Sequence, residues 1–302
     1  RYPFRLNTGR VRDQWHTMTR TGQSPRLAAH LAEPFLEIHP EDATALGIHP
    51  SDLVEVSSPT GVSILRARIT DAVQKGQVFA PMHWTAETAP SARIDALIAA
   101  ACDPVSGQPE SKAGVVDLRR FDAGWYGFAI AQKPMHLTAD YWALARTSHG
   151  FRAELAGRLH PDDWEAEARR LFDAPTAVLT TIIDARRGSA RIAAHADGLL
   201  LGALFVSPTP VAIMRDYLVT LPGTRAAGAL TGRPAADAPN PGPTLCSCFG
   251  VGINTILEAI ETRGLMSVES IGEALGAGTN CGSCRPEIAE LLNNLLTREA
   301  AE

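Results

Sequence analysis

The sequence predicts a multidomain chain: a β-rich part, then a mixed α and β segment, then a small helical part. Three observations support this order. Short runs of alternating apolar and polar residues fill positions 35–84. Longer strand-like runs with glycine turns fill positions 177–206, and two cysteine pairs after residue 243 each open onto apolar residues at helical spacing. Many short strands joined by tight turns are typical of a small barrel.

Length and composition are those of an ordinary soluble protein with two or three domains. Of the 302 residues, 45% are hydrophobic and 20% are charged. The formal charge of −5 disfavours nucleic-acid binding, which needs a basic surface. Because there is neither an apolar run of about 18 residues nor a signal peptide, we expect a cytoplasmic protein without membrane contact. The first residue is Arg1, not Met, so we expect part of a longer polypeptide.

Residues 1–120 are predicted to form the β-rich domain. Phe4 and Leu6 alternate with polar residues as in a short strand, and Asn7-Thr8-Gly9 then interrupts the pattern. Further strands are predicted at 35–39, 53–57, 62–69 and 78–84, and short helices at 40–46 and 92–98. Together these short elements indicate the barrel.

The segment after the first strand has the chemistry of a ligand-binding loop. It contains two arginines, Arg10 and Arg12, the polar residues Thr8, Gln14, His16 and Thr17, the aromatic Trp15 and the small Gly9. Arginine forks and hydroxyls bind phosphate, glycine admits close backbone approach, and an aromatic ring offers a flat surface to a ring system. The alternative is a solvated basic loop in which Trp15 is a hydrophobic anchor.

Residues 121–234 are predicted to form an α+β connecting domain. Trp142 and Trp164 suit charge-rich helices, and residues 210–221 suit another helix. Three strands are predicted at 177–184, 190–195 and 199–206, with glycine turns between them. No cofactor site is predicted in this segment. The Pro-rich run 235–243 is predicted to be a linker to the last domain.

Residues 244–302 hold four of the five cysteines. Cys246 and Cys248 form a C-x-C pair, and after 32 intervening residues Cys281 and Cys284 form a C-x2-C pair. Each pair lies near a predicted helix N-terminus, whose N–H groups and dipole stabilise anionic thiolates. An iron–sulfur cluster fits this arrangement. A structural zinc, two disulfides and ordinary buried thiols are alternatives, and Cys102 is predicted to be a buried small hydrophobe.

Both cysteine segments resemble the bacterioferritin-associated-ferredoxin (BFD) type of 2Fe–2S domain. They read Cys246-Ser-Cys-Phe-Gly-Val-Gly252 and Ala277-Gly-Thr-Asn-Cys-Gly-Ser-Cys-Arg-Pro-Glu287, and the resemblance covers about residues 243–296. It implies a small all-helical domain in which the four cysteines bind a 2Fe–2S cluster. Such a domain occurs alone, in nitrite reductases and at the C-terminus of bacterial assimilatory nitrate reductases.

Three segments of the first domain resemble the C-terminal cofactor domain of molybdopterin oxidoreductases. They are residues 6–20, 81–84 and 103–112. This resemblance implies a double-psi β-barrel that binds bis-molybdopterin guanine dinucleotide. Position by position, it assigns the cofactor contacts to Thr8, Gly9, Arg10, Val11, Arg12, Asp13, Gln14, Trp15, His16, Thr17, Trp84, Asp95 and Lys112. Asp95 lies where the family has an asparagine, and this departs from the pattern because an ionised aspartate cannot donate a hydrogen bond and repels phosphate.

Together the two resemblances imply the C-terminal part of an assimilatory nitrate reductase catalytic subunit. Such an enzyme reduces nitrate to nitrite at molybdenum-bis(molybdopterin guanine dinucleotide), with electrons from ferredoxin, flavodoxin or an NADH-linked flavoprotein. The N-terminal part of the same polypeptide would complete the cofactor site. We therefore assign no catalytic residue here and expect the isolated chain to be inactive. The alternatives are another molybdopterin enzyme, such as a formate dehydrogenase, and a non-catalytic electron-transfer or iron-handling partner protein.

Overall fold

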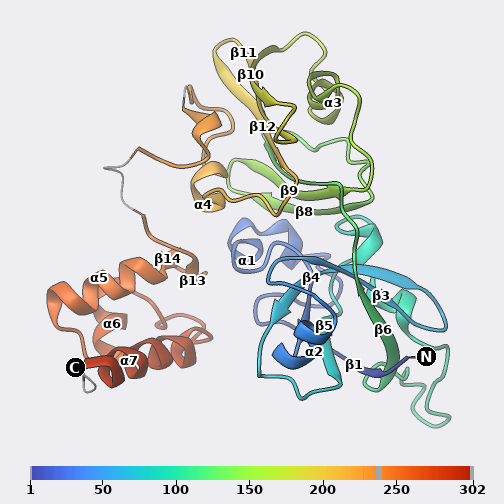
Figure 1. Ribbon diagram of the computed structural model, residues 1–302. Coiled ribbons are helices and arrows are strands. Elements are labelled where there is room, and N and C mark those ends of the chain that lie inside the picture. Colours follow the sequence, from blue (N-terminus) through green and yellow to red (C-terminus); the bar gives the residue numbers. More distant parts are fainter. Residues whose placement is uncertain (1, 227, 236–239, 300–302) are drawn as a thin grey trace.

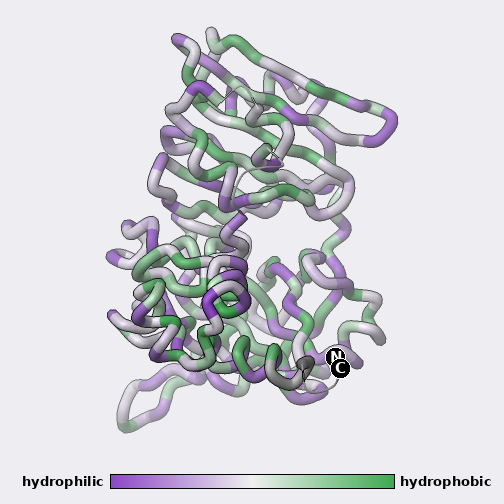
Figure 2. Tube along the Cα trace, turned by 90° about the vertical axis from the view of Figure 1, so that its left-hand side faces the viewer, coloured by the Kyte–Doolittle hydropathy of each residue, from purple (hydrophilic) through white to green (hydrophobic). Residues whose placement is uncertain are grey.

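The computed structural model describes residues 2–226, 228–235 and 240–299, which form three bodies (Figure 1). A six-stranded barrel and a six-stranded sheet are stacked on one another, and a mainly helical body lies beside the barrel. Hydrophobic stretches follow the strands of the sheet and the barrel, and hydrophilic residues mark many of the projecting loops (Figure 2). Among the described residues, no helix is both long and apolar enough to span a membrane.

The barrel closes in the strand order β1, β5, β2, β4, β3, β6. Its strands are β1 (Phe4–Gly9), β2 (Phe35–Ile38), β3 (Leu53–Ser57), β4 (Val62–Ile69), β5 (Gln77–Pro81) and β6 (Gly114–Arg120). The connecting segments hold the helices η1 (Thr21–Gln23), α1 (Pro25–His30), α2 (Pro40–Ala45), η2 (Pro90–Ala92) and η3 (Ile94–Leu97). The pairs β1–β5 and β2–β4 are parallel, and the other neighbouring pairs are antiparallel.

The β-rich prediction for this part is confirmed, with two corrections. The helix predicted at 92–98 is replaced by two short 3-10 helices, η2 and η3. Cys102 is exposed rather than buried, because it lies in a surface segment that forms only an isolated bridge with Pro109.

The second body is an antiparallel sheet in the order β10, β11, β12, β7, β9, β8. Its elements are β7 (Trp125–Ala131), β8 (Tyr141–Thr147), β9 (Gly150–Gly157), α3 (Trp164–Leu171), β10 (Val178–Asp184), β11 (Ser189–Ala196), β12 (Leu199–Ser207), α4 (Arg215–Leu218) and η4 (Ala229–Thr231). The strands β10, β11 and β12 are those predicted from the sequence. The helical prediction for Trp142 is wrong because this residue lies in β8, and the helix predicted at 210–221 is reduced to α4.

The barrel and the sheet share one hydrophobic core. Tyr126, Phe128 and Ile130 of β7 belong to the same buried cluster as the barrel residues Leu36 and Leu65. The alternate β7 residues pack on the opposite face of the sheet, in a second cluster that includes α3. All seven residues of β7 are consequently buried.

The third body has its own core and is helical except for a two-stranded ribbon. Its elements are β13 (Thr244–Cys246), β14 (Val251–Gly252), α5 (Ile253–Arg263), α6 (Val268–Leu275) and α7 (Arg285–Glu299). Ile256, Ile271 and Ile288, one from each helix, are fully buried in this core. Of the predicted linker, residues 236–239 lie outside the described residues. Pro241 and Pro243 accept hydrogen bonds from the first amides of α5.

Candidate functional site

The loops assigned to the cofactor by resemblance meet at one end of the barrel. β1 and β3 both run antiparallel to β6, and β5 runs parallel to β1. The C-terminal ends of β1, β3 and β5 therefore lie at the same end of the barrel as the start of β6. This places residues 10–17, residues 82–84 and the Ser111–Lys112 segment together.

The buried His83 side chain fixes the conformation of the loop after β1. Its side chain is 0% exposed. Its Nε2 accepts a hydrogen bond from the Val11 amide at 3.1 Å, and its Nδ1 bonds the His16 carbonyl. This pattern requires a neutral ring with its proton on Nδ1. Burial lowers the pKa of His83 more than the His16 carbonyl raises it, and the charge of Arg10 lowers it further.

Thr8, Gly9 and Lys112 fix the base of the loop. The Thr8 hydroxyl donates to the Ser111 carbonyl at 2.6 Å, and the Lys112 ammonium donates to the Thr8 carbonyl. A Cβ on Gly9 would lie only 2.7 Å from the Phe79 ring on β5, so this glycine serves the close approach of the two strands. These residues therefore build the scaffold of the loop.

Gln14 and Trp84 are also turned into the structure. The Gln14 amide donates to the Leu27 carbonyl at 3.2 Å, and the Trp84 side chain is 5% exposed in the shared core. Asp95 is exposed on η3 and Thr17 is exposed on the loop. Sequence reasoning grouped all of these residues as cofactor contacts, and it could not separate the scaffold from the surface.

Arg10 and Trp15 form the accessible face of the loop. Trp15 is 57% exposed, and the Arg10 guanidinium lies 5.5 Å from the centroid of its ring. A cation beside an aromatic face can bind a phosphate next to a ring system.

Arg12 and Asp13 face the helical body instead. The Arg12 guanidinium donates to the Leu245 carbonyl at 3.1 Å and pairs with the Glu287 carboxylate of α7. The Asp13 carboxylate lies 3.2 Å from Arg12 Nε, 2.9 Å from His30 Nδ1 and 3.5 Å from the Ser247 hydroxyl. Burial opposes ionisation of Asp13, but His30 and Arg12 outweigh it and lower its pKa.

The four clustered cysteines approach one another in two pairs. The sulfurs of Cys248 and Cys281 are 3.3 Å apart, and Cys246 is within hydrogen-bonding reach of Cys284. The first pair is partly or fully exposed and the second is buried. The Ser283 hydroxyl and amide lower the pKa of Cys281, whereas burial and Cys246 raise the pKa of Cys284 to about 11.

This donor set fits a two-iron cluster. Each iron of a 2Fe–2S cluster takes two of the four thiolates, and the structure presents two thiol pairs. α5 begins shortly after one cysteine segment and α7 begins directly after the other, as predicted. Within the described residues, no three or more His, Cys, Asp or Glu side chains are grouped to hold one metal ion.

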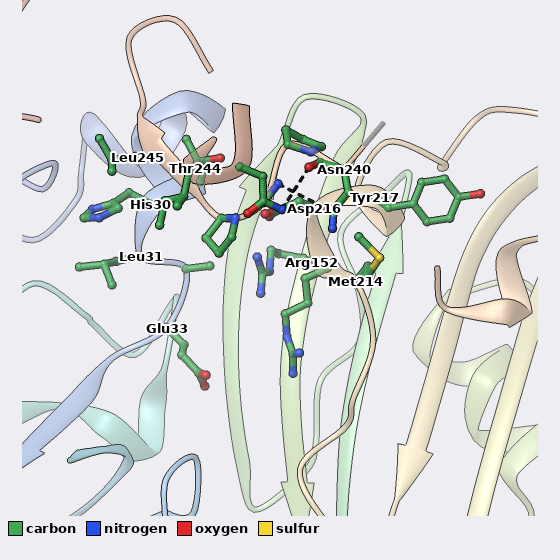
Figure 3. Close-up of a pocket in the computed structure, with 18 of the residues that line it drawn as sticks. His30, Leu31, Glu33, Arg152, Met214, Asp216, Tyr217, Asn240, Thr244 and Leu245 are labelled. Carbon is green, nitrogen blue, oxygen red and sulfur yellow. Dashed lines mark hydrogen bonds between the residues drawn. The ribbon is translucent and has the colours of Figure 1, made fainter. Parts of the chain in front are cut away.

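A cavity of about 1180 Å³ lies where the three bodies meet (Figure 3). Charged side chains in its wall are paired: Arg66 with Glu33 at 3.0 Å, and Arg215 with Glu154 at 2.6 Å. The labelled lining residues come from all three bodies and include His30, Leu31, Glu33, Arg152, Asp216, Thr244 and Leu245. The second body lines this cavity with β9 and with the segment around α4, so the cavity lies between these elements and the helical body.

Comparisons with known proteins agree with the two-site arrangement. Residues 4–115 match the molybdopterin dinucleotide binding domain family, and residues 244–294 match the BFD-like [2Fe-2S] binding domain family. A nitrate reductase of Klebsiella oxytoca is 37% identical over 96% of this chain and 34% of its own length. A nitrate reductase of Shewanella frigidimarina is 27% identical over 94% of this chain and 34% of its own length.

A third relative matches a shorter stretch of the chain. The α subunit of an F420-dependent formate dehydrogenase of Methanocaldococcus jannaschii is 40% identical over 119 residues, which cover 39% of this chain and 17% of that protein. The chain spans about a third of the length of the two nitrate reductases. It thus combines a molybdopterin dinucleotide-binding domain with a BFD-like 2Fe–2S-binding domain, and nitrate reductases are among its homologues.

Proposed function

We propose that this chain is part of a cytoplasmic, assimilatory nitrate reductase. The reaction is NO3⁻ + 2 e⁻ + 2 H⁺ → NO2⁻ + H2O. The observation that carries the proposal is the Klebsiella nitrate reductase match, which runs through the barrel, the sheet and the helical body alike. The direct contacts between the dinucleotide loop and the cysteine segments support it, since they bring the two cofactor-binding regions together.

In this proposal the barrel holds one side of molybdenum-bis(molybdopterin guanine dinucleotide). Its closed six-stranded form with two parallel pairs supports a double-psi barrel. Arg10 would bind a phosphate and Trp15 would pack against a ring, while His83 and Lys112 keep the loop in shape. When bound, molybdenum supplies two-electron oxygen-atom transfer. The N-terminal part of the same polypeptide would supply the rest of the pocket.

The helical body would relay electrons through a 2Fe–2S cluster on Cys246, Cys248, Cys281 and Cys284. The two thiol pairs favour this cluster over a single zinc ion, which needs its four ligands around one point. The partly exposed pair, Cys248 and Cys281, lies on the side from which a donor protein can approach. Ferredoxin, flavodoxin and an NADH-linked flavoprotein are the donor classes that suit such a relay.

A steady-state assay of the longer polypeptide tests this function. With reduced viologen, it should form nitrite from nitrate, in proportion to its molybdenum content. Omitting molybdate during expression is the matched control and should abolish the activity while the 2Fe–2S absorbance stays. A molybdenum-loaded polypeptide that forms no nitrite would contradict the proposal.

Formate oxidation is the second candidate. It is favoured by one observation, the 40% identity over 119 residues to a formate dehydrogenase subunit. That match covers 39% of this chain, whereas the two nitrate reductase matches cover 96% and 94% of it. Formate-dependent dye reduction by the same preparation, without nitrite formation, would select this candidate.

A further inference from the structure

We propose that Arg12 and Asp13 are docking residues for the helical body and do not bind the dinucleotide. They would hold the cluster-bearing segments against the cofactor loop. This inference rests on the proposed two-cofactor function, and it assigns the middle of the loop a role that differs from that of Arg10 and Trp15.

The contacts of Arg12 reach both cysteine segments. Leu245, which accepts a hydrogen bond from Arg12 at 3.1 Å, immediately precedes Cys246. Glu287, the ion-pair partner of Arg12, lies three residues after Cys284. One guanidinium therefore bridges the two segments that carry the cysteines.

All three nitrogens of the Arg12 guanidinium already have a partner. Its Nε, Nη1 and Nη2 are directed at Asp13, Glu287 and the Leu245 carbonyl respectively. The Arg12 side chain is 17% exposed and that of Asp13 is 10% exposed. Two carboxylates beside this guanidinium would repel a dinucleotide phosphate, so phosphate binding falls to the exposed Arg10.

Asp13 also lies close to residues of both the barrel and the helical body. His30 at the end of α1 lies 2.9 Å from the Asp13 carboxylate and is its neighbour on the barrel side. Ser247, between the first two cysteines, approaches the same oxygen at 3.5 Å. Asp13 is therefore a positioning residue with one neighbour on each side of the boundary.

The consequence is a loop with two faces. Arg10 and Trp15 face solvent, where the cofactor would lie, and Arg12 and Asp13 face the cysteines. Electron transfer slows steeply with distance. A contact that places the cluster segments on the back of the cofactor loop therefore shortens the route between the two centres.

A charge-swap series in the 302-residue chain, read by small-angle X-ray scattering, tests the docking. Arg12→Glu and Glu287→Arg should each increase the radius of gyration, because like charges then face each other, and the double variant should return to the wild-type value. Arg10→Glu, two residues earlier in the same loop, is the matched control and should leave the scattering unchanged. Visible absorbance of the cluster verifies that the helical body is folded in each variant.

The ligand role is tested in the longer polypeptide by molybdenum and guanine-nucleotide content. The double variant Arg12→Glu/Glu287→Arg should keep the cofactor, and Arg10→Glu should lower it several-fold. Single variants with the wild-type radius of gyration would overturn the docking role of Arg12. A double variant that is as compact as the wild type but has lost its cofactor would overturn the claim that Arg12 does not bind the dinucleotide. A wild-type polypeptide without molybdenum would refute the proposed function and leave the scattering test valid.

Discussion

Replacing His83 by Ala should release the cofactor loop while leaving the barrel folded. The substitution removes the bonds to Val11 and His16 and leaves a buried amide without a partner. Two hydrogen bonds contribute about 1 kcal/mol each, and the space left by the ring costs roughly another 1 kcal/mol. The loop should therefore be destabilised by about 3 kcal/mol, which is a roughly 100-fold change in its opening equilibrium.

Hydrogen–deuterium exchange measured over residues 10–17 reports this opening. His149→Ala, on the exposed turn between β8 and β9, is the matched control and should leave exchange in this loop unchanged. In the longer polypeptide, His83→Ala should also lower molybdenum content, because the loop is no longer preorganised. Wild-type exchange at residues 10–17 in His83→Ala would refute the reasoning that this ring holds the loop.

Three further predictions concern the metal, the cofactor and pH. Cys281→Ser should abolish the brown colour and the content of about two irons per chain, whereas the exposed Cys102→Ser should leave both intact. Arg10→Ala in the longer polypeptide should lower guanine-nucleotide content several-fold, as measured by nucleotide release and chromatography. Burial disfavours ionisation of Glu154, but Arg215 and the neighbouring arginines lower its pKa to about 2 from an ordinary 4.5. The stabilisation by ionised Glu154 is therefore present above pH 4.5 and should be lost as the pH falls from 4.5 toward 2. Glu154→Gln should reduce this pH dependence of the urea-unfolding midpoint. It should also lower the free energy of unfolding by about 3 kcal/mol at pH 7.

Whether an element could be predicted from the sequence depended on how its faces are buried in the fold. The barrel strands β1 to β5 and the sheet strands β10 to β12 alternate or run between glycine turns, so they were predictable, whereas β6 was not predicted. β7 was not, because the shared core covers one face and the α3 side covers the other, and burial on both faces removes the alternation. Trp142 was wrongly predicted to be helical because a single aromatic residue gives no hydrophobic periodicity.

The approach of the four cysteines was predictable because each pair has a short spacing beside a helical pattern, whereas the division of the cofactor loop into two faces was not. Residues 8–17 have the composition of a phosphate-binding loop whichever way their side chains point. Only the fold shows that Arg10 is exposed beside Trp15 while Arg12 is held by Glu287, which is 275 positions away in the chain. His83 carries no distinguishing sequence signal outside the family resemblance, since its role comes from burial under Val11 and His16.

The packing predicts that the chain comes apart at one boundary and not at the other. The barrel and the sheet share a hydrophobic core, so cleavage near residue 122 should leave them together, whereas the helical body has its own core and is held through polar contacts of Arg12 and Asp13. Such partly exposed contacts contribute about 1 kcal/mol each at most, too little to retain a severed domain at micromolar concentration. Proteolysis within 235–243 should therefore release a coloured C-terminal fragment that separates on gel filtration. A nicked chain that elutes as one species, or a released fragment that loses its cluster, would show that the helical body depends on the barrel for its fold.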